Sequence, residues 1–164
     1  MAKKHRQTCP IASFLNVFGD AWTLLVVREA FYGATRFGEF RNNTGAAKNI
    51  LSDRLAMLVD EGILTTVDVG EQGTRYEYRL TERGESLMPV FVAMTQWGNE
   101  QIYGARSEPV DFYEKASGKK LLKLQPRDRQ GNALANGDIA VKAGPGASAA
   151  TIKRISLIPD NECL

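Results

Sequence analysis

Residues 46–61 of this 164-residue chain read AAKNILSDRLAMLVDE, and this stretch decides the fold. Leu51, Leu55 and Leu58 recur at i, i+4 and i+7, which is the spacing of a single buried stripe along an α-helix. Gly62 follows and predicts the end of the helix. We therefore expect one buried face and one polar face that is free to contact another molecule. The polar face carries short side chains: Asn49, Ser52, Asp53 and Ala56.

The segment before this helix predicts a second, shorter helix. Thr35 can cap a helix over residues 36–42, in which Phe37 and Phe40 share one face. Residues 43–45 (NTG) predict a glycine-bearing turn between the two helices. Two helices joined by such a turn, the second with polar side chains outward, are typical of a helix-turn-helix motif.

A β-hairpin is predicted directly after this helix pair. Residues 63–69 and 75–80 alternate in strand fashion, and turn residues 70–73 lie between them. A hairpin in this position corresponds to the wing of a winged helix-turn-helix.

Further helices are expected on both sides of this winged unit. Residues 10–18 read as a short helix, Asp20 can cap a helix that runs to about Tyr32, and Thr81 can cap a third helix with a slight bend at Pro89. The apolar stripe of the third helix is longer than a small core needs, so we expect it to form a dimer contact with a second copy. Its members are Leu87, Val90, Phe91, Met94, Trp97 and Ile102.

The predicted fold class is α+β. A winged helix-turn-helix with flanking dimerisation helices is expected over residues 1–104, a small β appendage over 105–146 and a flexible tail over 147–164. The appendage contains three short stretches of strand character: residues 110–115, 119–125 and 138–143.

Charge and composition exclude several classes of protein. The net charge is +2, and residues 1–104 hold 11 basic against 12 acidic side chains, a net of −1. Any DNA affinity must therefore come from local placement of charge, and we expect it to be modest and steeply salt-dependent. The chain contains a single histidine, His5, and two cysteines, Cys9 and Cys163. From these low counts we expect no histidine metal site, no Ser-His-Asp triad and no disulfide framework. With no phosphate-binding glycine loop, we expect neither an enzyme nor a bound cofactor.

The sequence predicts a cytoplasmic protein with no membrane partner. Its longest apolar run near the start falls short of the roughly 18 residues that a membrane span needs. The basic N-terminus before residues 10–18 is similar to an export signal, but Pro10, Ser13 and Asn16 interrupt the apolar run.

Six strings stand in a fixed order along the chain: residues 9–10 (CP), 20–25 (DAWTLL), 36–40 (RFGEF), 50–55 (ILSDRL), 62–64 (GIL) and 76–84 (YEYRLTERG). Together they resemble the HxlR-type winged helix-turn-helix transcriptional regulators of bacteria and archaea, from about Cys9 to Ile102. The resemblance implies a homodimeric regulator that binds double-stranded DNA, with its recognition helix over residues 46–61 and its wing over 67–79.

The region after Gly104 weakly resembles a zinc-ribbon-like extension found behind some such domains. Where that extension carries cysteines, this chain has Ser117, Arg127 and Gln130, and none of these is a good zinc ligand. The resemblance therefore implies an appendage without a metal.

Lys48, Asn49 and Ser52 are the predicted centre of the DNA-reading surface. Asn49 can pair bidentately with adenine, Ser52 can donate or accept, and Lys48 can reach a phosphate or a guanine. Asp53 can accept from cytosine N4; alternatively it is simply solvated, or repels phosphate. Arg54 flanks the same face, where it contacts DNA or forms a structural ion pair beside the core.

Three arginines outside this helix are further candidates. Arg75, beside the wing tip, can enter the minor groove. Arg36 and Arg41, on the first helix of the motif, can touch backbone phosphates and so fix the register. The alternative for each is an exposed surface cation.

Cys9 is the candidate for redox chemistry. It lies close to Lys3, Lys4, His5 and Arg6 and just before a helix, and both conditions can lower a thiol pKa and make the thiol oxidisable. Some relatives in the resembled family sense oxidants or electrophiles with a cysteine at this point. The alternative is a partly buried thiol that packs under the dimer.

Two roles are open for a group of large apolar side chains: they line an effector pocket between subunits, or they are core and dimer contacts, which we favour. The group is Phe14, Phe18, Trp22, Phe91, Met94 and Trp97.

The leading function hypothesis is a dimeric, sequence-specific transcriptional regulator, expected to be a repressor. Two recognition helices would enter successive major grooves about 34 Å apart on an inverted-repeat operator. A small-molecule or oxidant effector is a further expected partner. The alternative is a winged-helix protein-interaction module without DNA binding, which the acidic balance of residues 1–104 favours.

Overall fold

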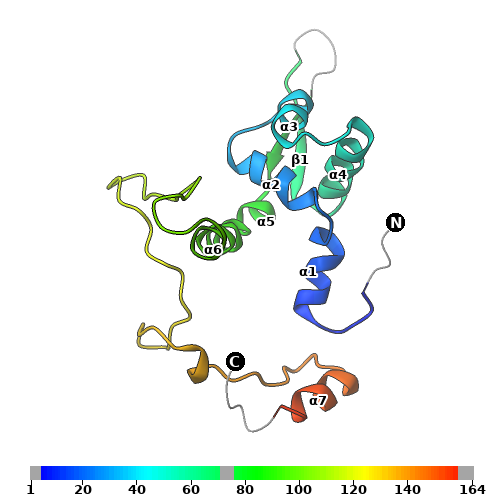
Figure 1. Ribbon diagram of the computed structural model, residues 1–164. Coiled ribbons are helices and arrows are strands. Elements are labelled where there is room, and N and C mark those ends of the chain that lie inside the picture. Colours follow the sequence, from blue (N-terminus) through cyan, green and yellow to red (C-terminus); the bar gives the residue numbers. More distant parts are fainter. Residues whose placement is uncertain (1–4, 71–75, 159–164) are drawn as a thin grey trace. The chain divides into compact units, whose positions relative to one another are not determined.

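The computed structural model describes residues 5–70 and 76–158, and the chain divides into two compact units (Figure 1). One unit consists of residues 14–91. The other joins the N-terminal residues up to Ser13 to the chain from Val92 onward.

The first two helices are α1 (Pro10–Phe18) and α2 (Thr23–Phe31). Asp20 caps α2 as predicted, because its Oδ1 accepts hydrogen bonds from the backbone amides of Trp22 at 2.8 Å and Thr23 at 3.0 Å. The helix ends at Tyr32, and the chain turns at Gly33 with a φ of 95°, a conformation that favours glycine.

The predicted helix pair is present as α3 (Phe37–Thr44) and α4 (Lys48–Asp60), joined through Gly45 with a φ of 71°. The predicted capping of α3 by Thr35 is wrong. The Glu39 carboxylate instead accepts the backbone amides of Thr35 at 2.8 Å and Arg36 at 2.9 Å. These two hydrogen bonds hold the pKa of Glu39 below its usual value.

The predicted hairpin is an antiparallel pair, β1 (Leu64–Asp68) and β2 (Tyr76–Leu80), with Leu64 opposite Leu80. The amide of Tyr78 also donates to the carbonyl of Thr35 at 2.8 Å, so the hairpin is tied to the start of the helix pair. Arg75, the predicted minor-groove residue, lies outside the described residues.

The single long helix expected after Thr81 is split into α5 (Glu82–Glu85), α6 (Met88–Gly98) and a π-helix, η1 (Asn99–Tyr103). Thr81 caps α5 as predicted, since its hydroxyl accepts the amide of Gly84 at 3.1 Å. The break at Leu87 places Pro89 in the first turn of α6, where the missing amide costs no helical hydrogen bond.

The core of the 14–91 unit lies between α2, α3, α4 and the hairpin. The predicted leucine stripe of α4 is completely buried in it, as is the Phe40 side chain of α3. The Phe40 ring meets the Tyr78 ring edge-on, with centroids 6.0 Å apart. The remaining side chains of this unit with less than 2% exposure are Leu64, Val26, Val27 and Thr23.

The second unit contains little regular structure. The predicted strands over residues 110–115 and 119–125 meet only in a single bridge, Tyr113 with Lys120, and residues 138–143 form no strand. A second bridge, Arg127 with Ala133, lies outside the three predicted stretches. A 3-10 helix, η2 (Asn136–Asp138), precedes this third stretch.

The expected flexible tail over residues 147–164 contains a helix, α7 (Ala149–Ser156). Ser148 caps it, because its hydroxyl accepts the amide of Thr151 at 3.3 Å. The helix was not predicted because the glycine-rich stretch at its start is typical of a linker.

The three positions where a zinc ribbon would carry cysteines form turn contacts in this unit. Ser117 donates to the Glu114 carboxylate, Arg127 donates to the Gly131 carbonyl at 2.5 Å, and the Gln130 amide donates to Asp128 at 2.9 Å. Residues 5–70 and 76–158 contain no group of three or more histidine, cysteine or acidic side chains placed to hold a metal.

Over the described ranges, each helix taken singly is too short or too polar to cross a membrane. Helices α1 and α2 reach the required length and hydropathy only when taken together, and a bend of 82° separates them.

Candidate nucleic-acid interface

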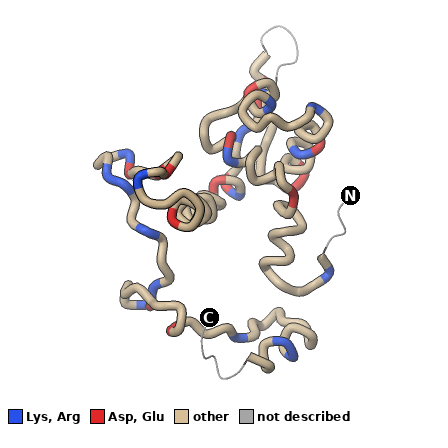
Figure 2. The backbone as a smooth tube through the Cα atoms, viewed as in Figure 1, with Lys and Arg blue, Asp and Glu red and all other residues tan. Residues whose placement is uncertain are grey.

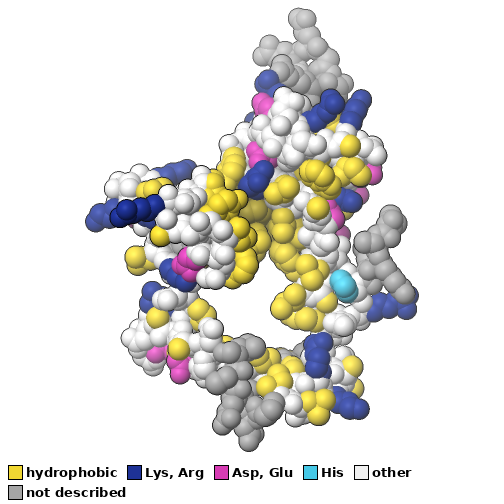
Figure 3. All heavy atoms as spheres, in the orientation of Figure 1, with side chains coloured by type: hydrophobic (Ala, Val, Ile, Leu, Met, Phe, Trp, Pro, Cys, Tyr) yellow, Lys and Arg dark blue, Asp and Glu magenta, His cyan; other side chains and the backbone are white. Residues whose placement is uncertain are grey.

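The polar face predicted for α4 is exposed in the structure. Lys48, Asn49, Ser52 and Asp53 all lie at the surface, opposite the buried leucines. Their side chains make no hydrogen bond or ion pair with any other described residue. Figure 3 shows lysine and arginine side chains at the end of this unit that holds α3 and α4. The face is therefore available to a partner, and the fold does not use its hydrogen-bonding groups.

Arg54 differs from these four residues because it is paired within the chain. Its Nε lies 3.2 Å from Asp20 Oδ1, although the geometry is not that of an aligned hydrogen bond. Of the two roles that the sequence left open, the structure shows the ion pair, which ties α4 to the start of α2.

Several groups act on the Asp20 carboxylate. Partial burial raises its pKa, but hydrogen bonds from the Thr23 hydroxyl and from the amides of Trp22 and Thr23, together with the charge of Arg54, hold the pKa below its usual value. The donors that Asp20 orients therefore also favour its ionised form.

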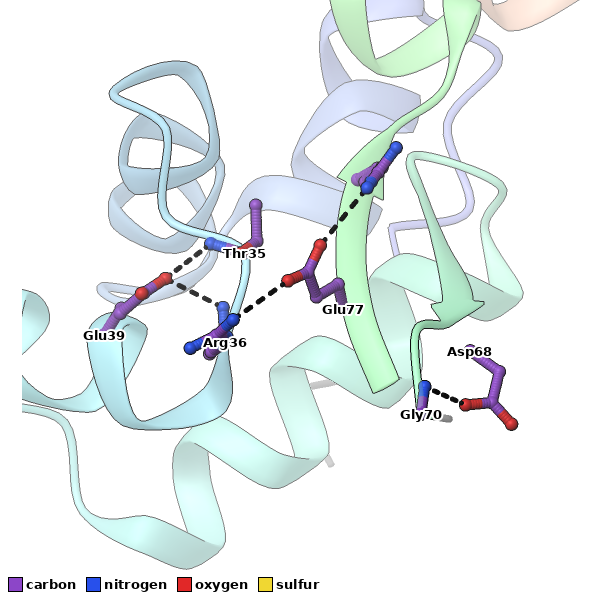
Figure 4. Close-up of polar contacts among 7 residues, drawn as sticks. Thr35, Arg36, Glu39, Asp68, Gly70 and Glu77 are labelled. Atoms are coloured by element: carbon purple, nitrogen blue, oxygen red, sulfur yellow. Dashed lines mark hydrogen bonds and ion pairs between the residues drawn. The ribbon is translucent and has the colours of Figure 1, made fainter. Parts of the chain in front are cut away.

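Arg36 lies at the start of α3 and faces the wing (Figure 4). Its Nη2 is 3.5 Å from Glu77 Oε1, and Arg79 Nη2 is 3.2 Å from Glu77 Oε2. The Glu77 side chain is only 14% exposed, whereas the two arginines are about half exposed. One carboxylate at the base of the wing therefore holds two solvent-facing cations.

Glu77 and Arg79 were missed by the sequence analysis, although a signal was present. Residues 77 and 79 alternate with Tyr78, whose ring contacts Phe40 in the core. Because alternate strand residues share a face, both charged side chains must lie on the face away from that contact.

Arg41 is exposed near the end of α3, and among residues 5–70 and 76–158 it has no ion-pair partner. Like Arg36, it thus occupies the surface position expected for a phosphate contact, and the expected contact remains a prediction.

Two further contacts fix the helix pair. The buried Glu29 carboxylate of α2 lies 2.6 Å from Arg28 Nη2 and accepts from the Asn43 side chain of α3 at 2.9 Å. Arg83 Nη1 donates to the Glu61 carbonyl at the end of α4 at 2.8 Å. These bonds orient α3 and α4 relative to α2 and the wing.

Cys9 is a free, half-buried thiol directly before α1. Hydrogen bonds from the backbone amides of Ala12 and Ile11 lower its pKa most. Burial raises the pKa, and the nearby Arg154 guanidinium of α7 lowers it by a smaller amount. The contribution of Arg154 could not be foreseen, because 145 residues separate it from Cys9 along the chain.

The predicted aromatic group does not act as one cluster. Phe14, Phe18, Trp22 and Phe91 belong to the core of the 14–91 unit. Met94 and Trp97 do not, and Trp97 is 63% exposed.

Comparisons with known proteins agree with this geometry. A family model described as HxlR-like helix-turn-helix matches residues 17–105. The HTH-type transcriptional regulator Rv3095 of Mycobacterium tuberculosis is 34% identical over 135 residues, which cover 82% of this chain and 85% of that protein.

Two solved structures are similar as well. PA1607, a candidate transcription factor, is 42% identical with a TM-score of 0.77, over 85% of this chain and 97% of that one. The reduced form of the redox regulator HypR is 30% identical with a TM-score of 0.51, over 55% of this chain and 94% of that one. These relatives are transcription factors and regulators rather than enzymes. The chain therefore belongs to the HxlR-like helix-turn-helix family of transcriptional regulators.

Proposed function

We propose that this protein is a homodimeric repressor that reads double-stranded DNA with α4. The observation that carries the proposal is the exposed polar face of α4, which has no side-chain partner in the described part of the chain and lies opposite a completely buried leucine stripe. Asn49 and Ser52 would bond to base edges in the major groove, with Lys48 at a phosphate or a guanine. Asp53 would accept from cytosine, and Arg54 would support the helix through Asp20.

Phosphate contacts would come from the elements on either side of α4. Arg36, Arg41 and Arg79 are exposed, and two of them are held by Glu77, so they can meet the backbone with little further ordering. Arg75 is the candidate for the minor groove. This small set of cations fits the modest, salt-dependent affinity expected from the charge count.

The homodimer is supported by exposed apolar side chains on and after α6. Trp97 and Ile102 are 63% and 67% exposed, a larger apolar surface than a soluble monomer commonly leaves in one helix. A second copy related by a twofold axis would cover it and would place two α4 helices on an inverted-repeat operator.

Regulation by an oxidant is the proposed signal. Cys9 has a lowered pKa, which increases its thiolate fraction and its reactivity with oxidants. The similarity to HypR, a redox regulator, supports this role.

Selection of bound duplexes from a random DNA pool, followed by fluorescence anisotropy, tests the proposal. Wild type should enrich an inverted repeat. Asn49→Ala and Ser52→Ala should each weaken binding roughly 5- to 150-fold, in line with about 1–3 kcal/mol per base contact. Lys48→Ala should weaken binding to all sequences if Lys48 contacts a phosphate, and to the selected operator above all if it contacts a guanine. Lys115→Ala, which removes the same charge from the second unit, should not weaken binding.

The alternative function, a protein-interaction module, is favoured by the net charge of −1 over residues 1–104. Under this alternative, selection from the random DNA pool should enrich no sequence, even at low salt. That result would overturn the DNA-binding proposal.

A further inference from the structure

The second unit contains a cavity of about 560 Å³ between the N-terminal segment and α7. This size is that of many small-molecule sites in proteins. Its polar lining comes from two guanidinium residues, three hydroxyl residues and one amide residue: Arg6, Arg154, Thr8, Ser148, Thr151 and Gln7.

The charged side chains that line the cavity, Arg6 and Arg154, are both positive. None of the described residues that line it is acidic. The sequence around it is also free of Asp and Glu, over residues 1–19 on one side and 139–159 on the other. In Figure 2, α7 accordingly carries basic positions and no acidic ones. Arg6 has no ion-pair partner among residues 5–70 and 76–158, so its charge is not neutralised there.

The walls of the cavity are joined to each other directly. Thr151 Oγ1 of α7 donates to the Thr8 carbonyl at 3.1 Å, and the Ser148 and Thr151 hydroxyls are 3.1 Å apart. These contacts hold the N-terminal segment against the first turn of α7, and the two arginines line the same space. The arrangement brings together cations that are 148 positions apart in the sequence.

We propose that this cavity binds a small organic anion through its carboxylate or phosphate groups, with Arg6 and Arg154 as the paired cations. Guanidinium groups recognise both anions bidentately, and the hydroxyls supply further donors. Duplex DNA is a poorer fit, because an indented site of this size admits a single small group rather than a continuous phosphate backbone. The site is separate from the DNA-binding proposal and does not depend on it.

An anion bound in the cavity would change the reactivity of the Cys9 thiol. Arg154 is one of the groups that lower the pKa of the Cys9 thiol. An anion bound to Arg154 competes for that guanidinium, so the thiolate fraction of Cys9 falls and its alkylation slows. The cavity would thereby couple an anionic metabolite to the reactivity of the thiol.

Isothermal titration of the 164-residue chain tests the site, with succinate, citrate and inorganic phosphate as separate probes at constant ionic strength. At least one probe should bind saturably, and comparison of the three distinguishes a carboxylate ligand from a phosphate ligand. Arg6→Ala and Arg154→Ala should each weaken binding 10-fold or more, and Arg154→Lys should retain part of it.

Lys153→Ala is the matched control, since Lys153 lies beside Arg154 on α7 but does not line the cavity. It should leave binding unchanged. Equal losses in Lys153→Ala and Arg154→Ala would show diffuse electrostatic attraction and overturn the proposal, as would the absence of saturable binding for all three probes.

A measurement on the wild-type protein needs no substitution. The rate of Cys9 alkylation by iodoacetamide, read by peptide mass spectrometry, should fall when the binding probe is added and stay constant with the same ionic strength of sodium chloride. An unchanged rate at a saturating probe concentration contradicts the placement of the anion on Arg154. DNA binding, measured separately, is expected to survive either outcome.

Discussion

Arg54 Nε of α4 lies 3.2 Å from Oδ1 of Asp20, the residue that caps α2. One carboxylate therefore both starts the central helix and anchors the helix proposed to read DNA. Asp20→Ala should lower the free energy of unfolding by about 1–2 kcal/mol, mainly through loss of the cap. Urea denaturation checks this value, and Asp53→Ala, which removes an exposed acid with no partner among residues 5–70 and 76–158, should change stability by less than about 0.5 kcal/mol.

The contribution of Asp20 should also depend on pH. Because its pKa is lower in the folded state than in the unfolded chain, it stabilises the fold fully above its unfolded pKa of about 3.9. That stabilisation is lost as the pH falls through the lower, folded pKa. The difference in stability between wild type and Asp20→Ala should be constant near neutrality and shrink below about pH 4. A difference that grows on acidification would contradict the assignment.

Gly84 is predicted to be intolerant of any side chain. A Cβ at this position would lie 2.3 Å from the Ile63 carbonyl oxygen, which is backbone and cannot move aside. Gly84→Ala should cost about 1–3 kcal/mol by overpacking. Gly38→Ala is the control: a Cβ there meets nothing within 4 Å, and helix α3 should be unchanged or up to about 1 kcal/mol more stable. Thermal melts of both variants test the contrast.

Arg36 and Arg79 are predicted to contact DNA phosphates as a pair. Each Arg→Ala variant should weaken binding at low salt and reduce the steepness of the log affinity against log salt plot by about one. Lys115→Ala serves again as the control with the same change in charge. If the slopes of all three variants equal that of wild type, Glu77 holds the two arginines for stability alone.

Cys9 is predicted to mediate the response to oxidants. Diamide should release wild-type protein from its operator, and Cys9→Ser should remain bound under the same treatment. Cys163→Ser, the other cysteine substitution available in the chain, should behave as wild type. A mobility shift at increasing diamide decides the matter, and release of Cys9→Ser at wild-type concentrations would remove Cys9 from the proposal.

Trp97 is predicted to lie at the interface between two copies. Trp97→Glu should shift sedimentation from dimer toward monomer, because a carboxylate would be buried without a partner. Leu157→Glu changes an even more exposed apolar side chain, 73% exposed, at the end of α7 and should leave the oligomeric state unchanged. Equal masses for the two variants and wild type would place the interface elsewhere.

The sequence predicted those parts of the fold that depend on local spacing. Helical periodicity alone identifies the stripe Leu51, Leu55 and Leu58. Helix α4 and its exposed face could therefore be predicted from residues within three turns of one another. The hairpin followed likewise from alternation. Thr35 as the cap of α3 was wrong because the helix begins one residue later than expected: Arg36 occupies the N-cap position, and Glu39 accepts from the amides of Thr35 and Arg36.

The contacts that sequence reasoning could not supply join distant positions. Arg36 and Glu77 are 41 residues apart, and Glu29 meets Asn43 across two helices. Such pairs depend on how helices pack, which no local pattern encodes. The second unit was harder still, since its bridges have few apolar side chains at regular spacing and α7 follows a glycine-rich stretch that is typical of a linker.

The side chains on the outer face of α4 take no part in packing, hydrogen bonding or capping within the described chain. Substitutions at these positions should therefore have little effect on the free energy of folding. Gene duplicates could exchange residues 48, 49, 52 and 53 freely and acquire new operators while the scaffold stays intact. The same independence makes these four positions a natural library for redirecting the protein to a chosen DNA sequence.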